Sequence, residues 1–193
     1  MKFEILDKQV VYKGFFQLEV YQLRHELYAG GWTGKVRREH LERGKAVAVL
    51  LHDPATDMLL LVEQFRIGAI RDEQGPWMLE IVAGMVEEGE ENADVARREA
   101  EEEAGCQVTE VEFIMDYYPS AGSCSETISI YYAPVDLSGI EPGIHGLAEE
   151  NEDIRTLLTP TKTAIEWLQA GKIRSSMTII ALQWLALKQL NNR

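Results

Sequence analysis

Cysteine is scarce in this chain, and long apolar runs are missing. Cys106 and Cys124 are the only cysteines among 193 residues, which argues against a disulfide framework and against a zinc site. The most apolar stretch, Met177 to Leu187, is interrupted by Gln183 and is too short to span a bilayer. Since no charged-then-apolar signal begins the chain either, the sequence predicts a cytoplasmic protein.

Positive charge is also in short supply. The chain has 19 Lys and Arg residues and 32 Asp and Glu residues, which gives a formal net charge of −13. Such a charge argues against a nucleic-acid binder and against a binder of anionic membranes. It would also repel an anionic ligand, so recognition of such a ligand would need locally placed positive charge. The length and the hydrophobic content of 46% are ordinary for a soluble globular domain.

The most informative pattern lies in residues 84 to 106, which read GMVEEGEENADVARREAEEEAGC. The segment matches the frame G-x5-E-x7-RE-U-x-EE-x-G-U, in which U is apolar, through Gly84, Glu90, Arg98, Glu99, Glu102, Glu103 and Gly105. A chance match has a probability on the order of 10⁻⁸ per starting position. This frame is that of the Nudix box, and the segment is identified as one.

The middle of the box has a helical sequence. No Gly or Pro occurs from Asn92 to Ala104, Asn92 is a suitable N-cap, and Gly105 suits a C-terminal stop. Three carboxylates spaced i, i+3 and i+4 would project from one face: Glu99, Glu102 and Glu103. Glu99 and Glu103 would repel each other by about 0.2–0.5 kcal/mol, and a bound Mg²⁺ or Mn²⁺ would replace this repulsion with coordination. The alternative is a solvated acidic helix face, and the complete frame favours the metal site.

Strand patterns surround the box on both sides. The predicted strands cover Phe16 to Tyr21, Val36 to Arg43, Ala46 to Leu51, Met58 to Gln64, Trp77 to Val82, Val108 to Tyr118 and Thr127 to Val135. A polar loop from Gly139 to Asp153 follows, and helices are predicted over Thr161 to Gln169 and Ser176 to Leu190. Strands with one inserted helix and terminal helices indicate an α/β (α+β) fold, such as a three-layer α/β/α sandwich.

Over nearly its whole length the chain resembles the bacterial ADP-ribose pyrophosphatase branch of the Nudix hydrolase superfamily. The resemblance rests on YKGFF at 12–16, VRREHLERG at 36–44, VEQFRIGA at 62–69, LEIVAGMVEEGE at 79–90 and GIHGLAEENEDIR at 143–155. It implies a Nudix α/β/α sandwich with a mixed sheet in residues 44–193, preceded by a small N-terminal β-domain in residues 1–43. It also implies a domain-swapped homodimer, in which the N-terminal part serves dimerisation and completes the partner's substrate pocket.

The same resemblance implies Mg²⁺-dependent hydrolysis of ADP-ribose to AMP and ribose 5-phosphate, with Mn²⁺ as a substitute metal. The metal ligands would be the backbone carbonyl of Ala83 and the carboxylates of Glu99, Glu103 and Glu152. Glu150 would be the base that takes a proton from the attacking water, and Glu102 a further acidic group near the metals. Substrate contacts would come from Phe15, Phe16, Arg38, Glu39, Arg43, Arg66, Met85, Ser120, Ala121, Gly122 and Glu126.

Alternative roles exist for several of these residues. Without the resemblance, Phe15 and Phe16 would be assigned to strand core and Arg66 to the surface. The histidines, His25, His40, His52 and His145, show no ligand spacing and receive no chemical role.

The chain departs from the branch in one loop, where Ser120-Ala121-Gly122 replaces the usual S-P-G. This departure leaves open a GDP-mannose or broader nucleoside-diphosphate-sugar pyrophosphatase. A catalytically silent nucleotide-sugar sensor is the more distant alternative, because the acidic ligands are all present.

Overall fold

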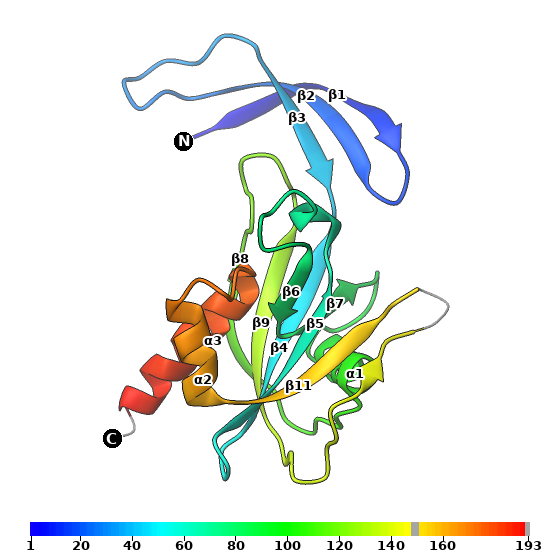
Figure 1. Ribbon diagram of the computed structural model, residues 1–193. Coiled ribbons are helices and arrows are strands. Elements are labelled where there is room, and N and C mark those ends of the chain that lie inside the picture. The colour runs from blue at the N-terminus through cyan, green and yellow to red at the C-terminus, as the bar shows by residue number, and fades with distance from the viewer. Residues whose placement is uncertain (148–150, 192–193) are drawn as a thin grey trace. The chain divides into compact units, whose positions relative to one another are not determined.

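The structure is a computed structural model that describes residues 1–147 and 151–191 (Figure 1). The chain forms two compact units. Met1–Lys45 and Tyr118–Thr127 make up the first, and Ala46–Tyr117 and Ile128–Arg193 make up the second. This division does not test the predicted domain boundary between residues 43 and 44, which stays a prediction.

The first unit is built on a three-stranded antiparallel sheet. Its strands run in the order β1 (Phe3–Lys13), β2 (Gln17–His25) and β3 (Val36–Glu42). The segment 118–127 joins this unit through backbone hydrogen bonds such as Leu41 N to Ser123 O at 2.7 Å. Strand β1 was not predicted from the sequence. Its register shifts between Ile5 and Asp7 and again between Val10 and Tyr12, and such irregularities disrupt the two-residue alternation that marks a strand.

The second unit contains an eight-stranded sheet. Six of its strands follow the order β10-β11-β5-β4-β9-β8, and the other two are β6, which pairs with β5, and β7, which pairs with β4. The strands are β4 (Lys45–Asp53), β5 (Met58–Phe65), β6 (Trp77–Glu80), β7 (Val82–Val86), β8 (Glu112–Tyr117), β9 (Thr127–Pro134), β10 (Ile144–His145) and β11 (Ile154–Pro160). The strand predicted over Trp77 to Val82 is thus two short strands, and Gly84 lies within β7. A 3-10 turn, η1 (Ile67–Ala69), follows β5.

Helices cover both faces of this sheet (Figure 1). Along β4, Val47, Val49 and Leu51 pack with α1 (Asn92–Ala104), whereas Ala48 and Leu50 pack with α3 (Ser176–Asn191). Helix α2 (Thr161–Gln169) shares the face of α3. A strand covered on both faces reads as a continuous apolar run, as residues 46–51 do. The predicted α/β/α sandwich with a mixed sheet is confirmed. In the described ranges, no helix is long and apolar enough to cross a membrane.

Helix α1 occupies the predicted range, and its two ends are held differently. Gly105 caps the C-terminus in the left-handed conformation, with φ at 60°, as predicted. The N-cap is Glu91, so the prediction of Asn92 as N-cap was wrong. The side chain of Asn92 instead donates from Nδ2 to Oγ of Ser129 at 2.9 Å, which ties the start of α1 to β9.

Candidate metal and substrate site

Glu103 of α1 is buried against β7 and β5. The residue is only 2% exposed. The backbone N–H of Ala83 donates to Oε2 at 3.0 Å, and Nε2 of Gln64 donates to Oε1 at 3.4 Å. Residues from two strands therefore hold this carboxylate in place.

The backbone of β7 also presses directly on Glu99. A Cβ at position 84 would lie 1.9 Å from Cδ of Glu99 and 2.0 Å from its Oε1, so any other residue there would displace the Glu99 carboxylate. This contact gives the first fixed glycine of the box a steric reason. It also brings Ala83 and Gly84 against the carboxylate face of α1, where the resemblance implies a backbone-carbonyl ligand.

Burial raises the pKa of Glu103 to about 8 and that of Glu99 to about 7. The Ala83 amide opposes the shift at Glu103 and the Arg98 guanidinium opposes it at Glu99, while the charge of Glu152 adds to both. Without a bound cation, burial thus stabilises these carboxylates in their protonated form near neutral pH. A hard divalent cation would stabilise the charged form instead, so the donor set fits Mg²⁺ or Mn²⁺.

Arg98 pairs with the outer carboxylates of the box. Its Nη1 lies 2.9 Å from both Oε1 of Glu99 and Oε2 of Glu102, and its Nε lies 3.7 Å from Oε1 of Glu90. Glu90 in turn accepts a hydrogen bond from the backbone N–H of Glu87 at 2.8 Å. Glu102 is therefore ion-paired on the rim of the site, whereas Glu103 is enclosed.

The hairpin of β10 and β11 brings the predicted loop ligand toward α1. Gly146 N donates to the carbonyl of Glu102 at 3.4 Å, and Leu147 N donates to Oε2 of Glu152 at 3.2 Å. Gly146 has φ at +101°, and a Cβ there would lie 2.6 Å from Cβ of Glu152, so glycine permits this close approach. Glu150, the predicted base, lies outside the described residues.

Two predicted substrate residues lie in the same unit as these carboxylates. Arg66 follows β5 and binds Oε2 of the buried Glu80 through Nε at 2.6 Å. The positive charge of Arg66 lowers the pKa of Glu103, which opposes the larger effect of burial. Met85 on β7 is partly exposed and lies two residues beyond Ala83, on the same side of the strand.

The first unit holds the other predicted substrate residues, and it brings four of them together. The guanidinium of Arg43 lies 4.4 Å from the ring centre of Phe16, and its Nη2 lies 3.2 Å from Oε1 of Glu126. Phe15 packs edge-on against Phe16 with ring centres 4.8 Å apart. Phe15 is 86% exposed, so the strand-core alternative for this residue is wrong in the single chain.

The remaining predicted residues of the first unit have local partners or lie exposed. Arg38 donates from Nη1 to the carbonyl of Arg37 at 2.9 Å, and Glu39 accepts from Nη1 of Arg37 at 2.8 Å. Residues 120–122 form an exposed turn, closed by Ser123 N donating to Ser120 O at 3.1 Å. The structure does not gather Arg38, Glu39 and this turn with Phe16 and Arg43 through any described hydrogen bond or ion pair.

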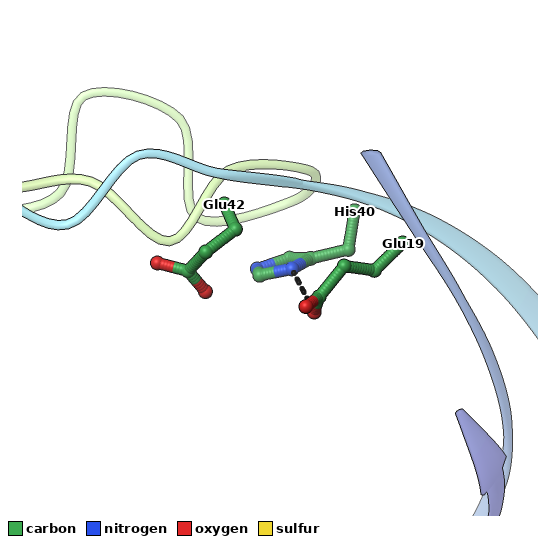
Figure 2. Close-up of side chains that lie close together, drawn as sticks. All are labelled: Glu19, His40 and Glu42. Carbon is green, nitrogen blue, oxygen red and sulfur yellow. Dashed lines mark ion pairs between the residues drawn. The ribbon is translucent and has the colours of Figure 1, made fainter. Parts of the chain in front are cut away.

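A polar cluster in the first unit was missed by the sequence reasoning. Among the described residues, carboxylate and imidazole atoms of Glu19, His40 and Glu42 lie within 4.8 Å of one another (Figure 2). Glu19 and His40 are direct cross-strand partners in β2 and β3, but that register cannot be read from sequence spacing. The atoms are close enough to hold a metal ion.

Glu19 has a neutralising partner without a metal. Lys8 Nζ lies 2.8 Å from its Oε1, and Tyr21 donates to Oε2 at 2.7 Å. Burial opposes ionisation of Glu19, yet hydrogen bonds from Lys8, Tyr21 and Gln17 lower its pKa to about 2. Because Lys8 already balances this charge, we assign the cluster to the stability of the three-stranded sheet.

The chain is similar to known proteins over most of its length. A family model described as the NUDIX domain matches residues 42–191. The chain is 47% identical over 184 residues to the ADP-ribose pyrophosphatase of Escherichia coli strain K12, covering 95% of this chain and 88% of that one. It is also 47% identical over 187 residues to the ADP-ribose pyrophosphatase of Haemophilus influenzae, covering 95% and 86% of the two chains.

More distant proteins also match. The GDP-mannose pyrophosphatase of Salmonella arizonae is 32% identical over 162 residues, with coverage of 82% of this chain and 83% of that one. A solved structure described as an ADP compounds hydrolase superposes with a TM-score of 0.72 and covers 100% of this chain and 96% of that one. Its sequence identity is 21%, so this likeness concerns the fold.

Proposed function

The chain belongs to the NUDIX domain family, and on that premise we propose that it hydrolyses the diphosphate of ADP-ribose to AMP and ribose 5-phosphate. The observation that carries the proposal is the carboxylate pair of α1, the buried Glu103 and the half-buried Glu99, held against Ala83 and Gly84. The substrate is supported by relatives at 47% identity that are named ADP-ribose pyrophosphatases, against 32% for a GDP-mannose pyrophosphatase.

The reaction depends on a divalent metal, and we propose Mg²⁺. The carbonyl of Ala83 and the carboxylates of Glu99, Glu103 and Glu152 would hold it. When bound, the metal neutralises charge on the diphosphate and lowers the pKa of a coordinated water. We assign Glu150 as the group that accepts a proton from the attacking water, after which a P–O bond of the diphosphate breaks. Arg98 keeps the outer carboxylates in place, and Glu102 contributes negative charge at the rim.

Recognition of the substrate is assigned to the predicted contact residues. The exposed ring of Phe15 and the half-buried ring of Phe16 are suited to stacking on adenine. Arg43 and Glu126 offer a donor and an acceptor for hydroxyls and phosphates. Arg66 is suited to the diphosphate because its guanidinium pairs with phosphate oxygens in a planar fork.

We further propose that the protein works as a homodimer formed through its first unit. Strand β1 exposes several large apolar side chains, namely Phe3, Ile5, Leu6, Val10, Val11 and Tyr12. An exposed apolar patch of this kind marks an interaction surface. Light scattering after size exclusion should give twice the 21.9 kDa chain mass. The mass of a single chain at micromolar concentration would contradict the dimer.

The trans contribution of Phe15 has its own test. If Phe15 of one subunit completes the site that contains Glu99 of the other, Phe15→Ala and Glu99→Gln should each be inactive or weakened. Unfolding and refolding them as a mixture should restore activity, because some dimers then contain one intact site. Refolding each variant alone is the control, and a mixture no more active than its components would show that Phe15 acts within its own chain.

The substrate is tested by comparing kcat/KM for ADP-ribose, GDP-mannose and other nucleoside diphosphate sugars with Mg²⁺. ADP-ribose should be preferred, and AMP and ribose 5-phosphate should appear in equal amounts. A preference for GDP-mannose would overturn the substrate, and binding of ADP-ribose without turnover would identify a sensor instead.

A further inference from the structure

Glu80 is a buried charge for which neither the box nor the resemblance gives a role. It ends β6 and is 5% exposed. A carboxylate at such depth is rarely tolerated unless a partner balances it. Its partner is Arg66, whose Nε donates to Oε2 at 2.6 Å, a short charge-assisted hydrogen bond.

The neighbouring strands explain why this pair lies beside the metal carboxylates. Strands β5 and β6 are antiparallel, with Val62 opposite Glu80 and Gln64 opposite Met78. Opposite residues share a face, and Val62 packs in the same apolar cluster as α1. Gln64 and Glu80 therefore face α1, and Gln64 reaches Glu103.

Arg66 is held through both its backbone and its side chain. Its backbone N–H donates to the carbonyl of Pro76 at 2.8 Å, and its Nε is held by Glu80. Neither terminal nitrogen has a hydrogen-bond partner among the described residues, and the side chain is 41% exposed. Two adjacent N–H-bearing nitrogens are thus left open near Glu103, in the arrangement that pairs with two phosphate oxygens.

We propose that Glu80 is a positioning residue for diphosphate recognition: it fixes the guanidinium of Arg66 so that both terminal nitrogens meet the phosphates. The inference rests on the proposed function, in which Arg66 contacts the diphosphate. The alternative is that Arg66 serves only to neutralise Glu80. The two differ in whether loss of Glu80 changes substrate binding or only stability.

The test compares Glu80→Gln, Arg66→Lys and the double variant. Glutamine keeps the shape of Glu80 but removes its charge, and lysine keeps the charge of Arg66 but lacks the planar fork. Asp94→Asn is a matched control, because it removes a carboxylate from a 2.7 Å pair with Arg97 on the exposed side of α1. KM and kcat are measured with ADP-ribose and saturating Mg²⁺, and the melting temperature is recorded for each variant.

Glu80→Gln should raise KM about tenfold, the loss typical of a hydrogen bond to a charged group, with a smaller change in kcat. In the Arg66→Lys background it should add little, because the fork it positions is already gone. The control should leave KM unchanged. The proposal is overturned if Glu80→Gln leaves KM at the wild-type value, or if it raises KM by the same factor with Lys at position 66. A fall in melting temperature with kcat and KM unchanged would assign Glu80 to stability alone.

A binding measurement separates this proposal from the proposed substrate. Calorimetry with α,β-methylene-ADP, a diphosphate that resists hydrolysis, needs no turnover. Glu80→Gln should weaken its affinity about tenfold in the wild-type background only. If the wild-type protein fails to hydrolyse ADP-ribose yet shows this pattern, the substrate is wrong and the positioning role stands. If ADP-ribose is hydrolysed but Glu80→Gln binds the analogue normally, the positioning role is wrong.

Discussion

Replacing Glu103 with glutamine should remove a pH-dependent instability from the metal-free protein. Burial raises the pKa of Glu103 from its ordinary value of 4.5 to about 8 in the folded chain. Because the folded-state pKa lies above the unfolded value, the folded protein keeps a proton that the unfolded chain releases. The stability linked to Glu103 is present below pH 4.5 and is lost as pH rises towards about 8.

The size of the effect follows from that window. Within it, one titrating group changes the free energy of unfolding by about 1.4 kcal/mol per pH unit. For a chain of this length, that slope corresponds to a fall in melting temperature of roughly 3–6 °C per pH unit. Glu99, with a pKa raised to about 7, adds a similar slope over a narrower range.

The assay is thermal unfolding in EDTA at half-unit steps from pH 5 to pH 8.5. The wild-type protein should lose stability across this range more steeply than Glu103→Gln, which keeps an acceptor for the Ala83 amide. Glu101→Gln, at an exposed position on the same helix, is the control and should follow the wild type. Added Mg²⁺ should stabilise the wild type increasingly as pH rises, and Glu103→Gln much less. If the melting temperatures of wild type and Glu103→Gln in EDTA fell in parallel with pH, the raised pKa of Glu103 would be refuted.

Three further outcomes test other parts of the site. Ala121 is the second residue of the turn closed by Ser120 O and Ser123 N, a position that favours proline, so Ala121→Pro should stabilise the protein by about 0.4–1 kcal/mol without changing substrate preference; a loss of stability in calorimetry would contradict that geometry. Gly84→Ala should displace Glu99 and weaken Mg²⁺ activation by at least about tenfold, with an unchanged activation curve counting against the close approach. Glu150→Gln should lower kcat by about 10²–10⁴ at a nearly constant melting temperature, and near-normal turnover would remove it from the base role.

The helix of the metal site could be predicted from the sequence because its determinants are local. Residues 92–104 carry helix-favouring side chains without Gly or Pro, and Gly105 ends the helix in the left-handed conformation. The apolar runs of β4 and β5 were equally clear, since both faces of each strand are covered. Local propensity and continuous burial therefore sufficed for the central sheet and α1.

Elements that depend on partners far along the chain were not predicted. Strand β1 contains bulges that break its alternation, and β7 contains Gly84, a residue depleted in strands. His40 acquires its neighbours through the register of β2 and β3, which spacing does not specify. The pairing of Arg66 with Glu80 likewise requires the antiparallel alignment of β5 and β6. In each case the missing information is a long-range pairing rather than a residue type.

That distinction bears on where the metal affinity of this protein originates. The glutamates of α1 would be ordinary solvated carboxylates in an isolated helix, with only weak mutual repulsion. Their raised pKa values come from burial, and the burial is imposed by the backbone of β7 and by Gln64 of β5. A peptide of residues 84–106 should therefore bind Mg²⁺ far more weakly than the folded chain, although it contains every fixed position of the box. The sequence motif supplies the ligands, and the sheet around it makes them a site.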